Sequence, residues 1–310
     1  MPQSSARASA ALLILAALGA VLLAGCGGSS SSATSSSGRL NVVAAEDFWG
    51  SIAEQLGGDR VEVTNIVTNP AADPHDYEPT AEDARTMAGA QMVIVNGVGY
   101  DPWASKLLAA NPSSGRTVLT VGDLLGLKEG DNPHQWYSPA SVQKVIEQVS
   151  ADYERADPGH ASYFEARQHR FETVGLARYH GLVSRIRSRY AGTPVGASES
   201  IFAALAPSLG LKLRTPTGFL DAISEGTDPT PADKAATDSQ IAGKKIKVWV
   251  YNRQNATPDV QRLNDAARAA GIPIATVTET MTPEGAGFQA WQSRELEGLA
   301  AALAGASGGG

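Results

Sequence analysis

Two short loops of the sequence place a histidine directly after a proline and two residues before an aromatic residue. The first loop, 73–80, holds His75, and the second, 132–139, holds His134. Proline fixes its own φ and biases the residue before it toward extended structure, so each imidazole is expected on a stiff loop. Imidazole is the commonest side-chain ligand of transition metals. Because the chain has only five histidines, two matching loops favour a metal site over two unrelated polar turns.

The rest of the sequence offers no catalytic apparatus. It contains no His-Glu-x-x-His, no serine nucleophile elbow and no phosphate-cradling glycine loop. The single cysteine excludes an intrachain disulfide and a cysteine-based zinc site. The remaining histidines, His160, His169 and His180, fall in one predicted helix and are interpreted as structural or solvent-facing. We therefore predict no catalytic residues.

The elements that position the two loops are short apolar strands that alternate with helical patterns. Hydrophobic residues are 43% of the chain and charged residues 18%, which is typical of a globular protein, and the net charge of −7 argues against a nucleic-acid partner. Strands are expected at 40–45, 61–67, 92–97, 117–121, 194–197, 246–251 and 272–277, and helices at 48–56, 81–88, 103–110, 139–154, 200–209, 231–242, 260–270 and 288–303. This alternation predicts two α/β lobes with mainly parallel sheets. Both histidine loops then fall where open sheets bind ligands, at the carboxyl ends of strands.

A long helix is predicted to join the lobes. The interval 159–191 has no strand pattern and no proline. About 30 residues in one helix would extend about 45 Å and act as a stiff spine. The expected division is an N-terminal lobe at 39–158, the spine at 159–191, a C-terminal lobe at 192–305 and a flexible tail at 306–310.

The N-terminus has the pattern of a secretory signal. Arg7 precedes an apolar run from Ala10 to Ala24, which is shorter than the roughly 20 residues of a transmembrane helix. Leu-Ala-Gly-Cys at 23–26 resembles a bacterial lipobox, which implies cleavage of a signal peptide at 1–25 and a lipid on the sulfur of Cys26. A plain signal peptide with an incidental cysteine is the alternative. A Gly/Ser-rich linker at 26–38 would tether the body to the outer face of the cell membrane.

These motifs together resemble the zinc- and manganese-binding lipoproteins of bacterial ABC metal importers. The likeness runs from 40 to 303 and includes both histidine loops, the Val-Ile-Val-Asn-Gly-Val-Gly-Tyr-Asp-Pro-Trp segment at 93–103 and Ser-Glu-Ser-Ile-Phe at 198–202. The resemblance implies a metal-binding helical-backbone fold with one ion between the lobes. It assigns as ligands His75, His134, Glu199 and Glu279. Around Glu279 the sequence departs from the family's usual Asp-Pro-Leu-Gly, so Asp221 and Glu225 are possible substitutes.

The expected function is capture of Zn²⁺ or Mn²⁺ outside the cytoplasmic membrane and delivery to an ABC permease. Two histidines and two carboxylates fill a four-coordinate shell, whereas a catalytic zinc keeps an open position. The alternatives are a surface-anchored zinc hydrolase and a metal-independent adhesion lipoprotein. Oxygen ligands favour Mn²⁺, whereas the Irving–Williams order favours Zn²⁺. We expect a monomer, as a tethered receptor usually is.

Overall fold

The computed structural model describes residues 38–70 and 75–308. The predicted signal peptide, the lipidation site Cys26 and nearly all of the predicted linker lie outside this part of the chain. None of the described helices combines the length and the apolar character that crossing a membrane requires.

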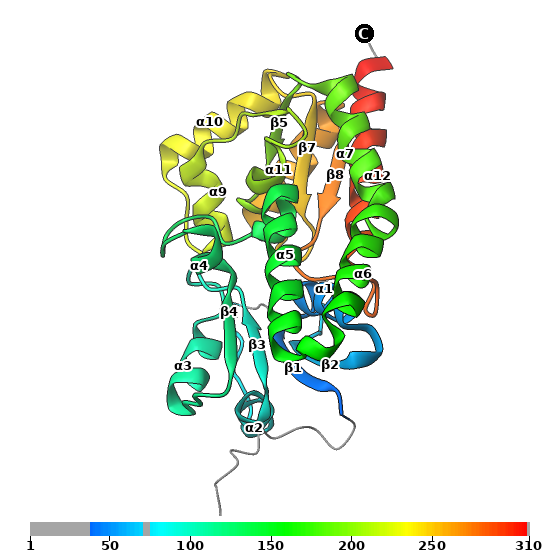
Figure 1. Cartoon of the computed structure of the whole chain (residues 1–310). Helices are drawn as coiled ribbons and strands as arrows, with labels where there is room; N and C mark the ends of the chain where they lie inside the picture. Colours follow the sequence, from blue (N-terminus) through cyan, green and yellow to red (C-terminus); the bar gives the residue numbers. More distant parts are fainter. Residues whose placement is uncertain (1–37, 71–74, 309–310) are drawn as a thin grey trace, which may run out of the picture. The chain divides into compact units, whose positions relative to one another are not determined.

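The first lobe is built on a four-stranded parallel sheet in the order β2-β1-β3-β4 (Figure 1). Its strands and helices are β1 (Leu40–Glu46), α1 (Asp47–Gly57), β2 (Val61–Val67), α2 (Ala81–Gly89), β3 (Met92–Val95), α3 (Pro102–Ala110), β4 (Thr117–Thr120) and α4 (Val121–Leu125), with a 3-10 turn at Gly58–Arg60. The middle strands β1 and β3 are almost wholly buried, which explains why they read as continuous apolar runs.

The second lobe repeats this plan with a parallel sheet in the order β6-β5-β7-β8. It consists of β5 (Pro194–Ala197), α8 (Ile201–Leu205), β6 (Lys212–Leu213), α9 (Thr217–Ser224), α10 (Pro231–Ala242), β7 (Val248–Asn252), α11 (Pro258–Ala269), β8 (Ile274–Val277) and α12 (Phe288–Gly308). The predicted fold class, two α/β lobes with parallel sheets, is confirmed. The strand β6 escaped prediction because two residues are too few to show a pattern.

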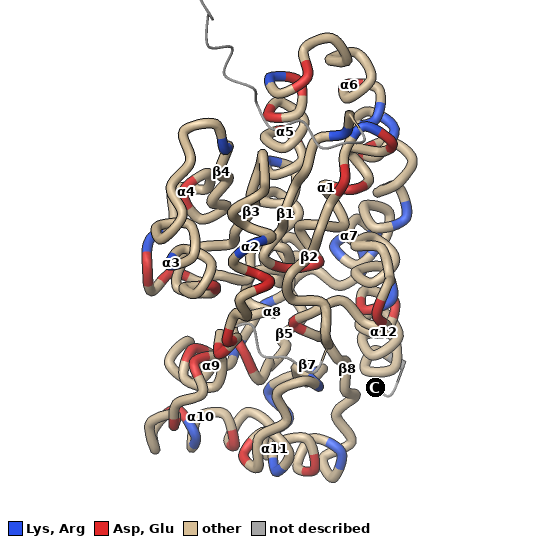
Figure 2. The backbone as a smooth tube through the Cα atoms, turned by 90° about the horizontal axis from the view of Figure 1, so that it is seen from below, with Lys and Arg blue, Asp and Glu red and all other residues tan. Residues whose placement is uncertain are grey.

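Helices connect the lobes on one side of the sheets. They are α5 (Pro139–Ala156), preceded by the 3-10 turn η2 (Gln135–Tyr137), and then α6 (Ala161–Arg170) and α7 (Ala177–Tyr190) after a turn at Pro158–His160. In Figure 1 these green helices extend from the first sheet toward the second, where α7 packs against α12. Charged residues on the second lobe are interspersed, with acidic and basic positions alternating along α11 (Figure 2).

The predicted single helix over 159–191 is interrupted, which corrects that expectation. Residues Phe171–Gly175 form a π-turn between α6 and α7, in which Leu176 N donates to Phe171 O, five residues earlier, at 2.8 Å. Both of these residues are buried, although their spacing of five does not fit one face of an α-helix. The inserted residue shifts the helix register so that both side chains reach the core.

One hydrophobic core runs through both lobes. It includes Val42 of β1, Trp136 and Tyr137 of η2, and Phe288 and Trp291 of α12. Each lobe adds a smaller cluster on the other face of its sheet. Because the lobes share packed side chains, they cannot separate widely without exposing that core. The helix α12 continues to Gly308, so 306–308 are helical rather than a flexible tail; the other domain boundaries stay predictions.

Candidate metal centre

The second histidine loop holds His134 in a buried position with a fixed tautomer. His134 is 1% exposed, and Asn132 Oδ1 lies 2.8 Å from its Nδ1. The amide nitrogen of Asn132 donates to Ser200 O at 2.7 Å, which assigns its oxygen to the imidazole. Nδ1 therefore carries the proton, and Nε2 presents a lone pair. This is how a metal-binding histidine is usually oriented by its neighbours.

The stiff geometry of this loop comes from the elements on either side. Ser138 caps α5 by accepting from Ser141 N at 3.3 Å, and Pro139 occupies the first turn of that helix. Before the histidine, Asn96 Nδ2 donates to Pro133 O at 3.1 Å. The backbone is thus held in place both before and after His134.

The first histidine loop brings His75 to the same place. Its imidazole packs edge-on against the buried ring of Tyr100, with 4.6 Å between ring centroids, and its side chain is 25% exposed. The loop leads into α2, whose first turn is fixed by a capping box between Thr80 and Asp83. Pro74, which the prediction used, lies outside the described residues.

Glu279 comes from the second lobe, just after β8. Its backbone nitrogen donates to Gln254 Oε1 at 2.6 Å, and Thr280 N donates to the same oxygen at 3.1 Å. The amide nitrogen of Gln254 in turn donates to Pro70 O of the first lobe at 2.6 Å. Gln254 therefore ties the Glu279 loop to the segment that precedes His75.

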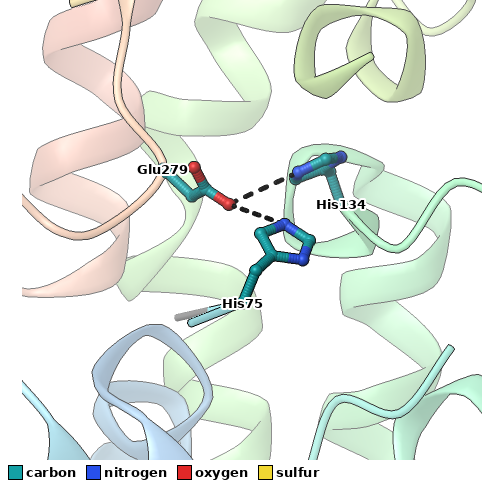
Figure 3. Close-up of side chains that lie close together, drawn as sticks. All are labelled: His75, His134 and Glu279. Atoms are coloured by element: carbon teal, nitrogen blue, oxygen red, sulfur yellow. Dashed lines mark ion pairs between the residues drawn. The ribbon is translucent and has the colours of Figure 1, made fainter. Parts of the chain in front are cut away.

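The three side chains converge on one point (Figure 3). The Nε2 atoms of His75 and His134 lie 3.3 and 3.6 Å from Glu279 Oε1, and one ligand atom from each residue lies within 4.8 Å of the others. Two ligands each about 2.1 Å from a tetrahedral ion are about 3.4 Å apart. The separations in the protein therefore suit a shared metal ion between these atoms.

The electrostatics of this group favour a bound cation. Burial lowers the pKa of His134, because desolvation disfavours the imidazolium form, although Glu279 opposes this effect. Burial acts to raise the pKa of Glu279, but the two imidazoles beside it outweigh burial and lower the pKa to about 2. At neutral pH the group thus offers a neutral imidazole at His134 and an ionised carboxylate at Glu279, which are the protonation states that coordinate metals.

The fourth candidate, Glu199, lies apart from this group. It is 2% exposed at the turn between β5 and α8, and its Oε2 accepts from Asn252 Nδ2 at 3.1 Å. Its carboxylate is not among the atoms that lie within 4.8 Å of one another. Its neighbour Ser200, however, places Oγ 3.2 Å from His134 Nδ1. Glu199 is therefore held beside the site without joining the three converging side chains.

A cavity of about 280 Å³ adjoins the two histidines and carries negative charge. Among the described residues, its lining includes four acidic residues and no Lys or Arg: Glu129, Asp131, Asp221 and Glu225. Burial raises the pKa of Asp221, as does the charge of Glu225. Figure 2 shows acidic positions beside α9. Asp221 and Glu225, which the sequence offered as substitutes for Glu279, thus line the approach, while Glu279 itself meets the histidines.

Several residues of the site were missed by sequence reasoning. Gln254 and Ser200 act through hydrogen bonds between segments distant in the sequence, and a polar residue in a loop gives no signal of such a partner. Asn132 could have been found, because an amide two residues before a candidate histidine ligand suits a partner for its Nδ1.

Comparisons with known proteins identify relatives that are named for metal binding. The family model described as "Zinc-uptake complex component A periplasmic" matches residues 42–302. The zinc-binding lipoprotein AdcA of Streptococcus pneumoniae is 25% identical over 84% of this chain and 55% of its own length. The iron-binding protein YfeA of Yersinia pestis is 28% identical over 56% of this chain and 58% of its own. The chain thus spans little more than half the length of these two curated relatives.

Solved structures share the fold. The Mn-bound periplasmic metal-binding protein of Candidatus Liberibacter asiaticus superposes with a TM-score of 0.71 at 21% identity, over 86% of this chain and all of the other. The periplasmic zinc-binding protein TroA of Treponema pallidum gives a TM-score of 0.70 at 18% identity, over 86% of this chain and 99% of TroA. The family match extends over most of the chain and over both sides of the site. The chain therefore belongs to the family described as zinc-uptake complex component A, periplasmic.

Proposed function

We propose that this protein binds one divalent transition metal ion, Zn²⁺ or Mn²⁺, between its two lobes and delivers it to the permease of an ABC importer. The observation that carries the proposal is the convergence of His75, His134 and Glu279 at separations that fit a shared ion. Two come from the first lobe and one from the second, so an ion there would bridge the lobes. The names of the relatives support transport rather than catalysis.

The ligand set extends the proposal to a fourth residue. We infer that Glu199 completes the shell by a small movement, because Ser200 next to it already contacts His134. A site with both imidazole nitrogen and carboxylate oxygen ligands can bind either Zn²⁺ or Mn²⁺. The relatives' names include zinc, manganese and iron, so they do not select one metal.

The cellular setting belongs to the same proposal. A lipid on Cys26 and a linker at 26–38 would hold a monomeric body at the outer face of the cell membrane, within reach of the permease. The core shared by both lobes supports a small local rearrangement on metal binding rather than a wide closure of the lobes.

Metal content tests the function. Protein purified without chelator is expected to carry up to one Zn²⁺ or Mn²⁺ per chain by elemental analysis. Titration of the metal-free protein, with Zn²⁺ and Mn²⁺ in competition, should then give one site per chain. Failure of both ions to bind would contradict the proposal. Turnover of ester, peptide or phosphate substrates by the metal-bound protein would instead support the hydrolase alternative.

The metal affinity should fall on acidification. Imidazole must lose its proton to coordinate, and an unperturbed histidine has a pKa of about 6.5. The depressed pKa of His134 keeps this residue neutral into more acidic solution, which delays but does not remove the effect. We expect at least tenfold weaker binding at pH 5 than at pH 7, measured by competition with a chromophoric chelator of known pH dependence. Equal affinity at both pH values would argue against histidine ligation.

A further inference from the structure

One buried tyrosine links the segments that carry His134 and Glu279. Tyr137 lies three residues after His134, and Thr278 directly precedes Glu279. The Tyr137 hydroxyl lies 2.7 Å from Thr278 O and accepts from Thr278 N at 3.3 Å. Tyr137 is fully buried and Thr278 is 3% exposed. A displacement of either segment therefore disturbs the other.

Glu295 of α12 closes this link into a network. Its Oε2 lies 2.5 Å from the Tyr137 hydroxyl, and its Oε1 accepts from Thr278 Oγ1 at 2.8 Å and from Trp291 Nε1 at 2.9 Å. Trp291 also donates to Thr278 Oγ1 at 2.8 Å. One carboxyl group thus accepts from side chains of both ligand-bearing segments and from its own helix.

The scaffold behind this carboxyl group is buried and packed on several sides. The helix α12 packs against β8 and α7, and the ring of Trp291 is buried edge-on against Tyr137, with 5.7 Å between ring centroids. Burial raises the pKa of Glu295 to about 7, even though the hydrogen bonds from its three donors lower it. Removal of this carboxyl group would take the acceptor from the buried Thr278 hydroxyl, which is costly inside a protein, and would leave Tyr137 and Trp291 with Thr278 alone as acceptor.

We propose that Glu295 is a positioning residue, which holds the His134 and Glu279 segments at metal-binding separation through Tyr137 and Thr278. This inference rests on the proposed function. Glu295 would touch neither the ion nor its ligands. It acts instead on the distance between His134 of the first lobe and Glu279 of the second. This distance decides the affinity for an ion of fixed radius.

The test compares variants that keep or remove the acceptor. Glu295→Leu has a similar volume and no acceptor, whereas Glu295→Gln keeps an oxygen for Thr278 and Trp291. We expect Zn²⁺ affinity to fall by 10- to 100-fold in Glu295→Leu and by less than about threefold in Glu295→Gln.

In Tyr137→Phe the Zn²⁺ affinity should fall about tenfold. In the double variant Tyr137→Phe/Glu295→Leu it should fall by less than the product of the two single effects. Glu297→Gln, an exposed acid two residues along α12, is the matched control.

Spectroscopy separates positioning from general destabilisation. Bound Co²⁺ reports ligand geometry by its visible absorption, so the spectrum of Glu295→Leu should differ from the wild type and that of Glu297→Gln should not. Wild-type affinity and spectrum in folded Glu295→Leu and Tyr137→Phe would overturn the positioning role while leaving the metal site intact. If the wild type itself bound no metal, the proposed function would fail instead. Should Glu295→Leu not fold, Tyr137→Phe alone decides, because it removes a single oxygen.

Discussion

Replacement of either histidine by alanine is expected to weaken metal binding by more than 100-fold, the largest effect of any single substitution. Loss of an outer partner of a ligand costs 10- to 100-fold in typical metal sites, and loss of the ligand itself costs more. A 100-fold loss corresponds to about 2.8 kcal/mol of binding free energy. His134→Ala removes a buried ring beside Trp136, whereas His75→Ala truncates a partly exposed loop residue.

The difference in burial makes His75→Ala the sharper experiment. Its far-ultraviolet circular dichroism and unfolding midpoint should match the wild type, so a loss of affinity there reports ligation and not folding. His169→Ala is the control, because His169 is exposed on α6, away from the converging side chains. Wild-type affinity in His75→Ala, measured by calorimetry with Zn²⁺ and with Mn²⁺, would remove His75 from the coordination shell.

The sequence predicted the architecture well where a local pattern carries the information. Buried parallel strands such as β3 read as apolar runs, and helix starts such as those of α5 and α10 show a proline after a capping hydroxyl. The π-turn at Phe171–Gly175 was missed because a one-residue insertion does not abolish the helical pattern of hydrophobic residues. It only shifts that pattern by one position. The turn is visible only once both Phe171 and Leu176 are seen to be buried.

The site was predictable in part for a related reason. Two residues, His75 and His134, belong to loops whose local sequence fixes the backbone, so their chemistry could be anticipated from spacing alone. Glu279 has no such signature, and only the resemblance to a family pointed to it. The hydrogen bonds of Gln254 and Glu295 join segments from distant parts of the chain, and only the fold brings these partners together.

Carboxylate neutralisation should have the second-largest effect. Glu279→Gln keeps the shape of the side chain but removes the negative charge that faces both imidazoles. The pKa of Glu279 is held at about 2, so the carboxylate is fully ionised at neutral pH and the substitution removes a whole charge from the site. A neutral amide oxygen is a weaker ligand for a divalent ion, and we expect about 100-fold weaker binding of Zn²⁺ and Mn²⁺.

The exposed Glu284, five residues further along the same loop, supplies the control for that experiment. Glu284→Gln changes the net charge of the chain equally and should leave affinity within about twofold, because charge at a solvent-exposed position is screened. Equal losses in both variants would mean that the loop acts on the metal only through its overall negative charge.

The same comparison between Glu199→Gln and Asp221→Asn identifies the carboxylate that acts as the fourth ligand. A loss of tenfold or more in Glu199→Gln alone is expected, since Asp221 lines the approach to the site while the buried Glu199 directly precedes Ser200, whose hydroxyl contacts His134.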